Sequence, residues 1–201
     1  MSGSQVEYRR GEYRKSAARR EQILEAAFAV FSELGYTASS VSEISRRVGM
    51  TQTGVLHHFK GGKTALLQAV LDRRDEEAQR IISDKRGIEF LRSLARITET
   101  QLDKRGMIQA YRMLSTEAIN PDHPAHEHFR ERQQMVVRGV EKAFREAAED
   151  GDAPADLDAR AAALSSLAMT EGLEVMWLNG FDVDMVAGSR RHIQQFLTTE
   201  L

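Results

Sequence analysis

The chain has 201 residues, of which 41% are hydrophobic, and this is enough to bury a core in one or two domains. It contains no cysteine, which excludes disulfides, thiol nucleophiles and cysteine-ligated zinc and is compatible with a reducing compartment. No stretch is long and apolar enough to be a membrane span, so we expect a soluble cytoplasmic protein.

The net charge of −2 hides an asymmetry between two parts of the chain. Residues 1–63 contain 10 Lys and Arg against 6 Asp and Glu, whereas residues 64–201 contain 18 against 24. The positive first part favours a polyanionic partner, although a solvated charged surface gives the same count. Residues 1–15 are polar and arginine-rich, and we expect a disordered basic arm there, which either follows DNA phosphates or is simply a soluble tail.

From residue 16 onward, apolar residues recur at helical spacing, and no segment alternates like a strand. Breaks at glycine, proline and asparagine clusters divide this pattern into about nine helices. The sequence therefore predicts an all-α protein.

Two of the expected helices are short and adjacent. Ser40 and Glu43 form a capping box for the first, Gly49 permits the left-handed turn that ends it, and Thr51 caps the second, which runs to about His58. Two short helices joined this tightly match a helix-turn-helix, whose second helix enters the major groove of DNA. A structural corner in an all-helical domain is the alternative.

A Gly-Lys-Thr sequence at residues 62–64 resembles the end of a nucleotide-binding phosphate loop. Such a loop needs a glycine five residues earlier, where this chain has His57, and it follows a buried strand, which is missing here. We interpret this segment as the start of the fourth helix, where Lys63 and free backbone amides can hold a DNA phosphate.

Three linked segments resemble the TetR family of transcriptional regulators. They are Glu33-Leu34-Gly35-Tyr36, residues 40–49 and residues 50–59, and the resemblance extends over residues 16–72. Two departures are Leu56, where the family often has tyrosine, and the loop at residues 60–63, which is one residue longer than usual. The resemblance implies a three-helix head at residues 16–63, a linking helix at 64–84, and a ligand-binding and dimerisation bundle at 85–201.

The same resemblance implies a repressor that a small-molecule effector releases from a palindromic operator in double-stranded DNA. The expected DNA-binding residues are Ser40, Thr51, Gln52, Thr53, Gly54, His57, His58, Lys60 and Lys63. Among them, we expect Gln52, Thr53 and His57 to face base edges and most of the others to hold phosphates.

In the body, we expect a mostly apolar pocket lined by Met107, Tyr111, Leu114, Glu117, Phe129, Met135 and Trp177, with Gln134 and Glu171 as further polar groups. A tight core uses the same residue types. For a homodimer formed by helices at 156–179 and 182–198, the expected interface residues are Ala161, Ser165, Ala168, Gly172, Ile193 and Phe196. An intrachain seam is the alternative there.

We expect no cofactor, no metal and no catalytic site. His123, His126 and His128 invite a metal interpretation, but His126 and His128 are two residues apart and face different sides of a helix. The motifs Gly-x-Ser-x-Gly and His-Glu-x-x-His do not occur. Besides the regulator, the sequence leaves open a helical interaction or small-molecule-binding protein that no longer binds DNA.

Overall fold

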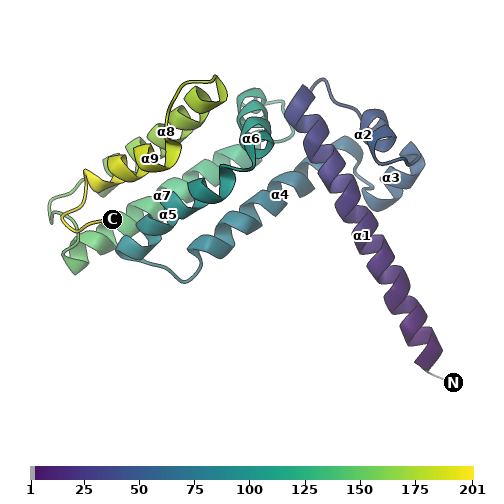
Figure 1. Cartoon of the computed structure of the whole chain (residues 1–201), viewed down its shortest axis with the longest axis horizontal. Coiled ribbons are helices and arrows are strands. Elements are labelled where there is room, and N and C mark those ends of the chain that lie inside the picture. Colours follow the sequence, from purple (N-terminus) through teal and green to yellow (C-terminus); the bar gives the residue numbers. More distant parts are fainter. Residues whose placement is uncertain (1–2) are drawn as a thin grey trace. The chain divides into compact units, whose positions relative to one another are not determined.

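The computed structural model describes the backbone of residues 3–201 and the side chains from Lys15 onward (Figure 1). The helices in this part of the chain are α1 (Gly3–Leu34), α2 (Val41–Arg47), α3 (Gln52–His58), α4 (Gly62–Ile82), α5 (Gly87–Gln101), α6 (Arg105–Glu117), α7 (His126–Asp150), α8 (Ala159–Leu178) and α9 (Met185–Gln194). The described residues form nine helices and no strand, which confirms the predicted all-α class.

The first helix begins earlier than the sequence predicts. We expected a disordered arm over residues 1–15, whereas α1 extends back to Gly3, and residues 1 and 2 lie outside the described residues. Residues 4–15 contain no proline and several Glu, Arg and Lys, which are good helix formers, so a helix can continue there without core contacts. Whether this segment binds phosphates stays a prediction.

The chain divides into two compact units, and the boundary lies inside α4. The first unit ends at Arg73 and the second comprises Arg74–Leu201. The sequence places boundaries at the two ends of the fourth helix, but α4 is one continuous helix that contributes residues to both units.

In the first unit, α2 packs against both α1 and α3. Phe31 of α1 is fully buried, and its ring centroid lies 6.0 Å from that of Tyr36 in the following turn. Fully burying a side chain of this size contributes about 1.5–3 kcal/mol. The other buried apolar residues of this unit are Ile23, Leu24, Ala27, Val30, Ile44, Val55, Phe59, Leu66, Leu67, Val70 and Leu71.

In the second unit, α7 packs against α5 and α8, and α9 packs against α8 and α5. Phe144 of α7 is fully buried in the core between these helices and meets Phe196 edge to face, with ring centroids 5.6 Å apart. Residues of all four helices, and of the segments beside α8 and α9, form the core cluster: Leu91, Val137, Val140, Ala143, Phe144, Ala147, Ala153, Ala159, Ala162, Ala163, Ile193 and Leu201.

The last two helices are shorter than the sequence predicts. α8 begins after Asp158 and α9 after Asp184, because each aspartate carboxylate accepts a hydrogen bond from a backbone amide three residues on, at 2.9 Å in both cases. α9 ends at Gln194, where the amides of Gln195 and Phe196 bond to carbonyls three residues back and tighten the turn.

No helix among the described residues combines the length and apolar character that crossing a lipid bilayer requires.

Candidate functional site

The two short helices of the first unit are held by the caps that the sequence predicts. The Ser40 hydroxyl accepts a hydrogen bond from the Glu43 amide at 3.1 Å, and the Thr51 hydroxyl accepts one from the Gly54 amide, also at 3.1 Å. Between the helices, Gly49 has a φ of 64°, a left-handed conformation that glycine adopts without strain. The structure therefore contains a helix-turn-helix made of α2 and α3.

The Glu43 carboxylate does not complete the capping box, in which it would accept a hydrogen bond from the backbone amide of Ser40. It accepts hydrogen bonds from Arg46 and Arg47, and the Arg47 guanidinium also donates to Glu33 of α1 at 2.7 and 2.6 Å. The hydrogen bonds from Arg46 and Arg47 lower the pKa of Glu43 to about 2. This ionic chain connects α1 to α2 on the surface of the head.

The exposed face of α3 is polar, as expected for a helix that meets base edges. Gln52, Thr53 and His57 are exposed, whereas Val55 is buried and holds the helix against the core. Side chains with amide, hydroxyl and imidazole groups can hydrogen-bond to bases in the major groove. Leu56, where the family often has tyrosine, is 39% exposed beside them and adds an apolar contact to this face.

Gly54 has a packing role, and its expected contact with DNA stays a prediction. A Cβ atom at this position would lie 3.1 Å from Met50 Cε and 3.3 Å from Thr51 Oγ1, and real Cβ contacts are rarely that close. A side chain here requires Met50 or the Thr51 cap to shift by a few tenths of an ångström. This residue therefore shapes the helix-turn-helix from inside.

The expected phosphate-binding residues differ in their accessibility. Ser40 is exposed at the start of α2, Thr51 and Lys60 are exposed at the two ends of α3, and His58 is half-buried. The assignment of Lys63 to a phosphate is not supported, because its ammonium donates to the carbonyls of Tyr36 at 2.8 Å and Ser39 at 2.9 Å. Lys63 therefore stabilises the turn between α1 and α2.

Arg20 is a residue of the head that sequence reasoning missed. Its guanidinium donates to the His58 carbonyl at 2.8 Å and stacks on the Phe59 ring at 4.0 Å from the centroid. It satisfies a free carbonyl at the end of α3 and so connects α3 to α1. The two partners are 38 positions apart in sequence, so no local spacing could reveal the contact.

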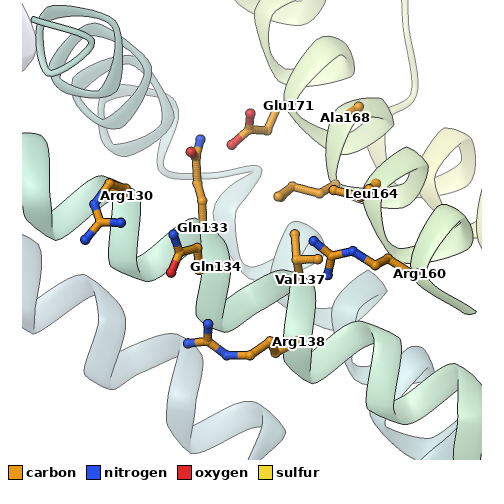
Figure 2. Close-up of a pocket in the computed structure, with 10 residues that line it drawn as sticks. Arg130, Gln133, Gln134, Val137, Arg138, Arg160, Leu164, Ala168 and Glu171 are labelled. Carbon is orange, nitrogen blue, oxygen red and sulfur yellow. The ribbon is translucent and has the colours of Figure 1, made fainter.

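A cavity of about 600 Å³ lies in the second unit between α7 and α8 (Figure 2). Glu171 of α8 lies opposite the glutamines of α7 across this space. Both Gln134 and Glu171 were expected beside a pocket. The lining residues are Arg130, Gln133, Gln134, Val137, Arg138, Arg160, Leu164, Leu167, Ala168 and Glu171.

None of the seven other residues expected to line a pocket lines this cavity. Tyr111, Leu114 and Phe129 are buried, and the rings of Tyr111 and Phe129 meet edge to face at 5.0 Å. Met135 is 59% exposed, so its expected place in an internal pocket is wrong. Met107, Glu117 and Trp177 are half-buried.

A buried polar cluster surrounds Tyr111. Three guanidinium groups lie near its ring centroid, Arg74 of α4 at 3.5 Å, and Arg112 of α6 and Arg132 of α7 at 5.0 Å each. We call these four residues, together with Asp75, His128, Glu171 and Glu174, the Tyr111 cluster. All of them belong to the second unit.

The carboxylates of the Tyr111 cluster are committed to two of its arginines. Asp75 accepts a hydrogen bond from Arg132 at 2.6 Å and lies 3.3 Å from His128 Nε2. Arg112 pairs with Glu171 at 3.0 Å and with Glu174 at 3.1 Å. Burial raises the pKa of Glu174 and also that of the Tyr111 hydroxyl.

The residues expected at a dimer interface are split between the surface and the core of one chain. Ala161, Ala168 and Gly172 are exposed along α8, where Leu164 is also 48% exposed. Ser165 Oγ lies 3.3 Å from His192 of α9. Ile193 is buried within its own chain, so its assignment to an interface is wrong, whereas Phe196 is half-buried and packs on Phe144, and its place at an interface stays a prediction.

The three histidines that invited a metal interpretation point to different partners. His123 lies 3.7 Å from Glu117, His126 Nδ1 lies 2.8 Å from the Ala118 carbonyl, and His128 belongs to the Tyr111 cluster. Among the residues whose side chains are described, no group of three His, Asp or Glu could hold a metal ion.

Comparisons with known proteins agree with the helix-turn-helix. The model of bacterial regulatory proteins of the tetR family matches residues 23–70. An HTH-type transcriptional repressor from Mycobacterium tuberculosis is 38% identical over 72 residues, which are 36% of this chain and 37% of that protein. The HTH-type transcriptional regulator TtgW from Pseudomonas putida is 35% identical over 94 residues, 45% of this chain and 68% of that protein.

The chain belongs to the TetR family of transcriptional regulators. A solved TetR-family regulator from Agrobacterium tumefaciens shares its fold, with a TM-score of 0.77 over 91% of this chain and all of that one, at 18% identity. This TetR-family protein is thus a DNA-binding transcriptional regulator and not an enzyme. Its match to the repressor from Mycobacterium tuberculosis spans about a third of that protein's length.

Proposed function

We propose that the protein is a cytoplasmic repressor that binds a palindromic operator as a homodimer and leaves it when a small molecule binds to the second unit. Residues 16–63 form the DNA-binding head, residues 64–84 transmit the signal, and residues 85–201 bind the effector and form the dimer. The matched relative from Mycobacterium tuberculosis is described as a repressor, which supports this direction of control.

The observation that carries the proposal is the position of the Tyr111 cluster. Arg74 and Asp75 of this cluster lie on α4, the same continuous helix that begins in the DNA-binding head. A ligand that changes the partners of these two residues changes the position of α4, and with it the head that α4 enters. By population shift, the effector then favours a head-to-head spacing that no longer fits DNA.

In the DNA-bound dimer, two α3 helices lie about 34–36 Å apart, which is one turn of DNA. Gln52, Thr53 and His57 read base edges, and Ser40, Thr51, His58 and Lys60 hold phosphates. Selection of duplexes from a random pool with the purified protein should therefore yield inverted repeats. Selected DNA that carries a single half-site would contradict the palindromic operator.

Repression and its release are tested with the selected operator placed between a promoter and a reporter gene. We expect the protein to lower reporter expression and the small-molecule fraction of a cell extract to restore it. Increased expression on adding the protein would identify an activator instead. If the protein represses the reporter and no extract fraction restores expression, the repressor function is supported and the release by a small molecule is not.

Dimerisation is proposed to use the exposed apolar stripe of α8, formed by Ala161, Leu164, Ala168, Gly172 and Val175, which recurs about every three or four residues along one face. Of the residues expected from α9, Ile193 is buried in the core and Phe196 is partly buried against it, so the proposal relies on α8.

We expect Ala168→Arg to convert the dimer to a monomer, because it places a charge at the centre of an apolar interface that would bury it unpaired. Sedimentation at micromolar concentration measures the change. The control is Ala155→Arg, an exposed position outside the helices, which should leave the dimer intact. A dimer that survives Ala168→Arg would place the interface elsewhere.

A further inference from the structure

The Tyr111 cluster contains buried donors without acceptors. Tyr111 is 3% exposed and its hydroxyl has no hydrogen-bond partner, and the same holds for Nε and Nη1 of the Arg74 guanidinium stacked on its ring. A buried donor left unpaired costs about 1–3 kcal/mol. Such donors are retained where an acceptor arrives during function.

The pairing within the cluster leaves Arg74 without a hydrogen-bonded carboxylate. Asp75 is committed to Arg132 and His128, and Glu171 and Glu174 are committed to Arg112. Arg74 approaches a carboxylate only at Asp75, where the atoms are 3.8 Å apart and form no hydrogen bond. The Arg74 guanidinium and the Tyr111 hydroxyl thus lack an acceptor, which an anion can supply.

Apolar side chains lie beside these donors. Phe129 packs against the Tyr111 ring, and Leu114 is fully buried on the same helix as Tyr111. Glu171, which pairs with Arg112 in the cluster, also lines the cavity between α7 and α8, so the cluster borders an existing space. A carboxylate brings less negative charge than a dianionic phosphate into a buried cluster that already holds three carboxylates, and it accepts in the plane that a guanidinium presents.

We propose that the effector is an apolar carboxylic acid whose carboxylate is bound by Arg74 and Tyr111. The proposal rests on the effector-binding role of the second unit given above. Because Arg74 lies on α4, the acid would supply its charge to the helix that enters the head.

The test uses the full chain without DNA and matched pairs of ligands, benzoate with benzamide and hexanoate with hexanamide, at equal ionic strength. We expect both acids to raise the thermal midpoint of unfolding and the amides to have no effect, because only the acids supply a negatively charged partner for Arg74. Acids and amides that act alike, or no shift with either acid at about 10 mM, would overturn the proposal.

Two variants locate the binding. Tyr111→Phe keeps the ring and removes only the hydroxyl, and it should raise the dissociation constant of the acids at least about tenfold. Arg74→Met should remove the difference between acid and amide and leave the ligand-free midpoint equal or higher, since its buried donors are unpaired. Tyr36→Phe in the head and Arg145→Met at an exposed position of α7 outside the cavity are the matched controls, and both should bind the acids like the parent.

Acid affinity that survives Tyr111→Phe would overturn the proposal and would indicate that a buried water satisfies the hydroxyl. The result is independent of operator release. If a neutral compound releases the protein from its operator and does not need Tyr111 to do so, the repressor mechanism stands and the proposal of a carboxylic acid effector is wrong. If the acids bind at Arg74 and Tyr111 but do not change operator affinity, the carboxylate site stands and the proposed release of the repressor by this ligand is wrong.

Discussion

Replacing Phe31 with alanine should destabilise the DNA-binding head by about 3–5 kcal/mol, because the substitution removes a fully buried ring and leaves a cavity. The chain contains a single tryptophan, Trp177, which lies in the second unit. Circular dichroism follows the helices of both units, whereas tryptophan fluorescence follows the second. In Phe31→Ala, we expect the circular dichroism signal to acquire an early transition while the fluorescence midpoint stays unchanged.

The matched control for this prediction is Leu34→Ala on the same helix. Leu34 is 42% exposed, so its truncation should cost less than about 1 kcal/mol. If the fluorescence midpoint falls together with the circular dichroism midpoint in Phe31→Ala, the two units unfold in one cooperative transition. The prediction that the head unfolds separately is then wrong.

The second large effect is expected at the operator. The combined variant Gln52→Ala, Thr53→Ala and His57→Ala should lower affinity for the selected operator at least about 100-fold, since each good base contact contributes about 1–3 kcal/mol. Affinity for unrelated DNA should stay within about threefold, because phosphate contacts supply non-specific binding. Fluorescence anisotropy with labelled duplexes measures both.

All three side chains are exposed, so the unfolding midpoint of this variant should match that of the parent. Gln133→Ala, an exposed glutamine on α7 in the second unit, should bind the operator like the parent. Operator affinity that is unchanged in the triple variant would show that α3 is not the recognition helix. It would also revive the interpretation of a helical protein that has lost DNA binding.

The features that could be predicted from the sequence are those determined by neighbouring residues. The caps at Ser40 and Thr51 and the left-handed Gly49 follow from residues within a few positions of one another, and they define the helix-turn-helix. The contacts of Lys63 could not be predicted, because its partners, the carbonyls of Tyr36 and Ser39, are brought to it by tertiary packing. The same holds for Arg20 and for the Tyr111 cluster, which joins residues of α4, α6, α7 and α8.

One error could have been avoided from spacing alone. Met135 follows Phe129 by six positions, which places it about 120° around the helix from that buried residue. Phe129 is buried and Met135 is exposed, as this phase requires. Ile193 is a different case, because its helical phase fits either a core or an interface, and only the packing of α9 on α5 and α8 decides between them.

The crowding around Gly54 has a consequence for how the DNA specificity of this protein can evolve or be redesigned. A side chain at this position would displace Met50 or the Thr51 cap, whereas Gln52, Thr53, Leu56 and His57 are exposed. Substitutions at the four exposed positions can therefore change the preferred base sequence at little cost in folding. A library that randomises these four positions and keeps Gly54 should yield folded variants with new operators, while one that includes position 54 should lose many of its members to misfolding.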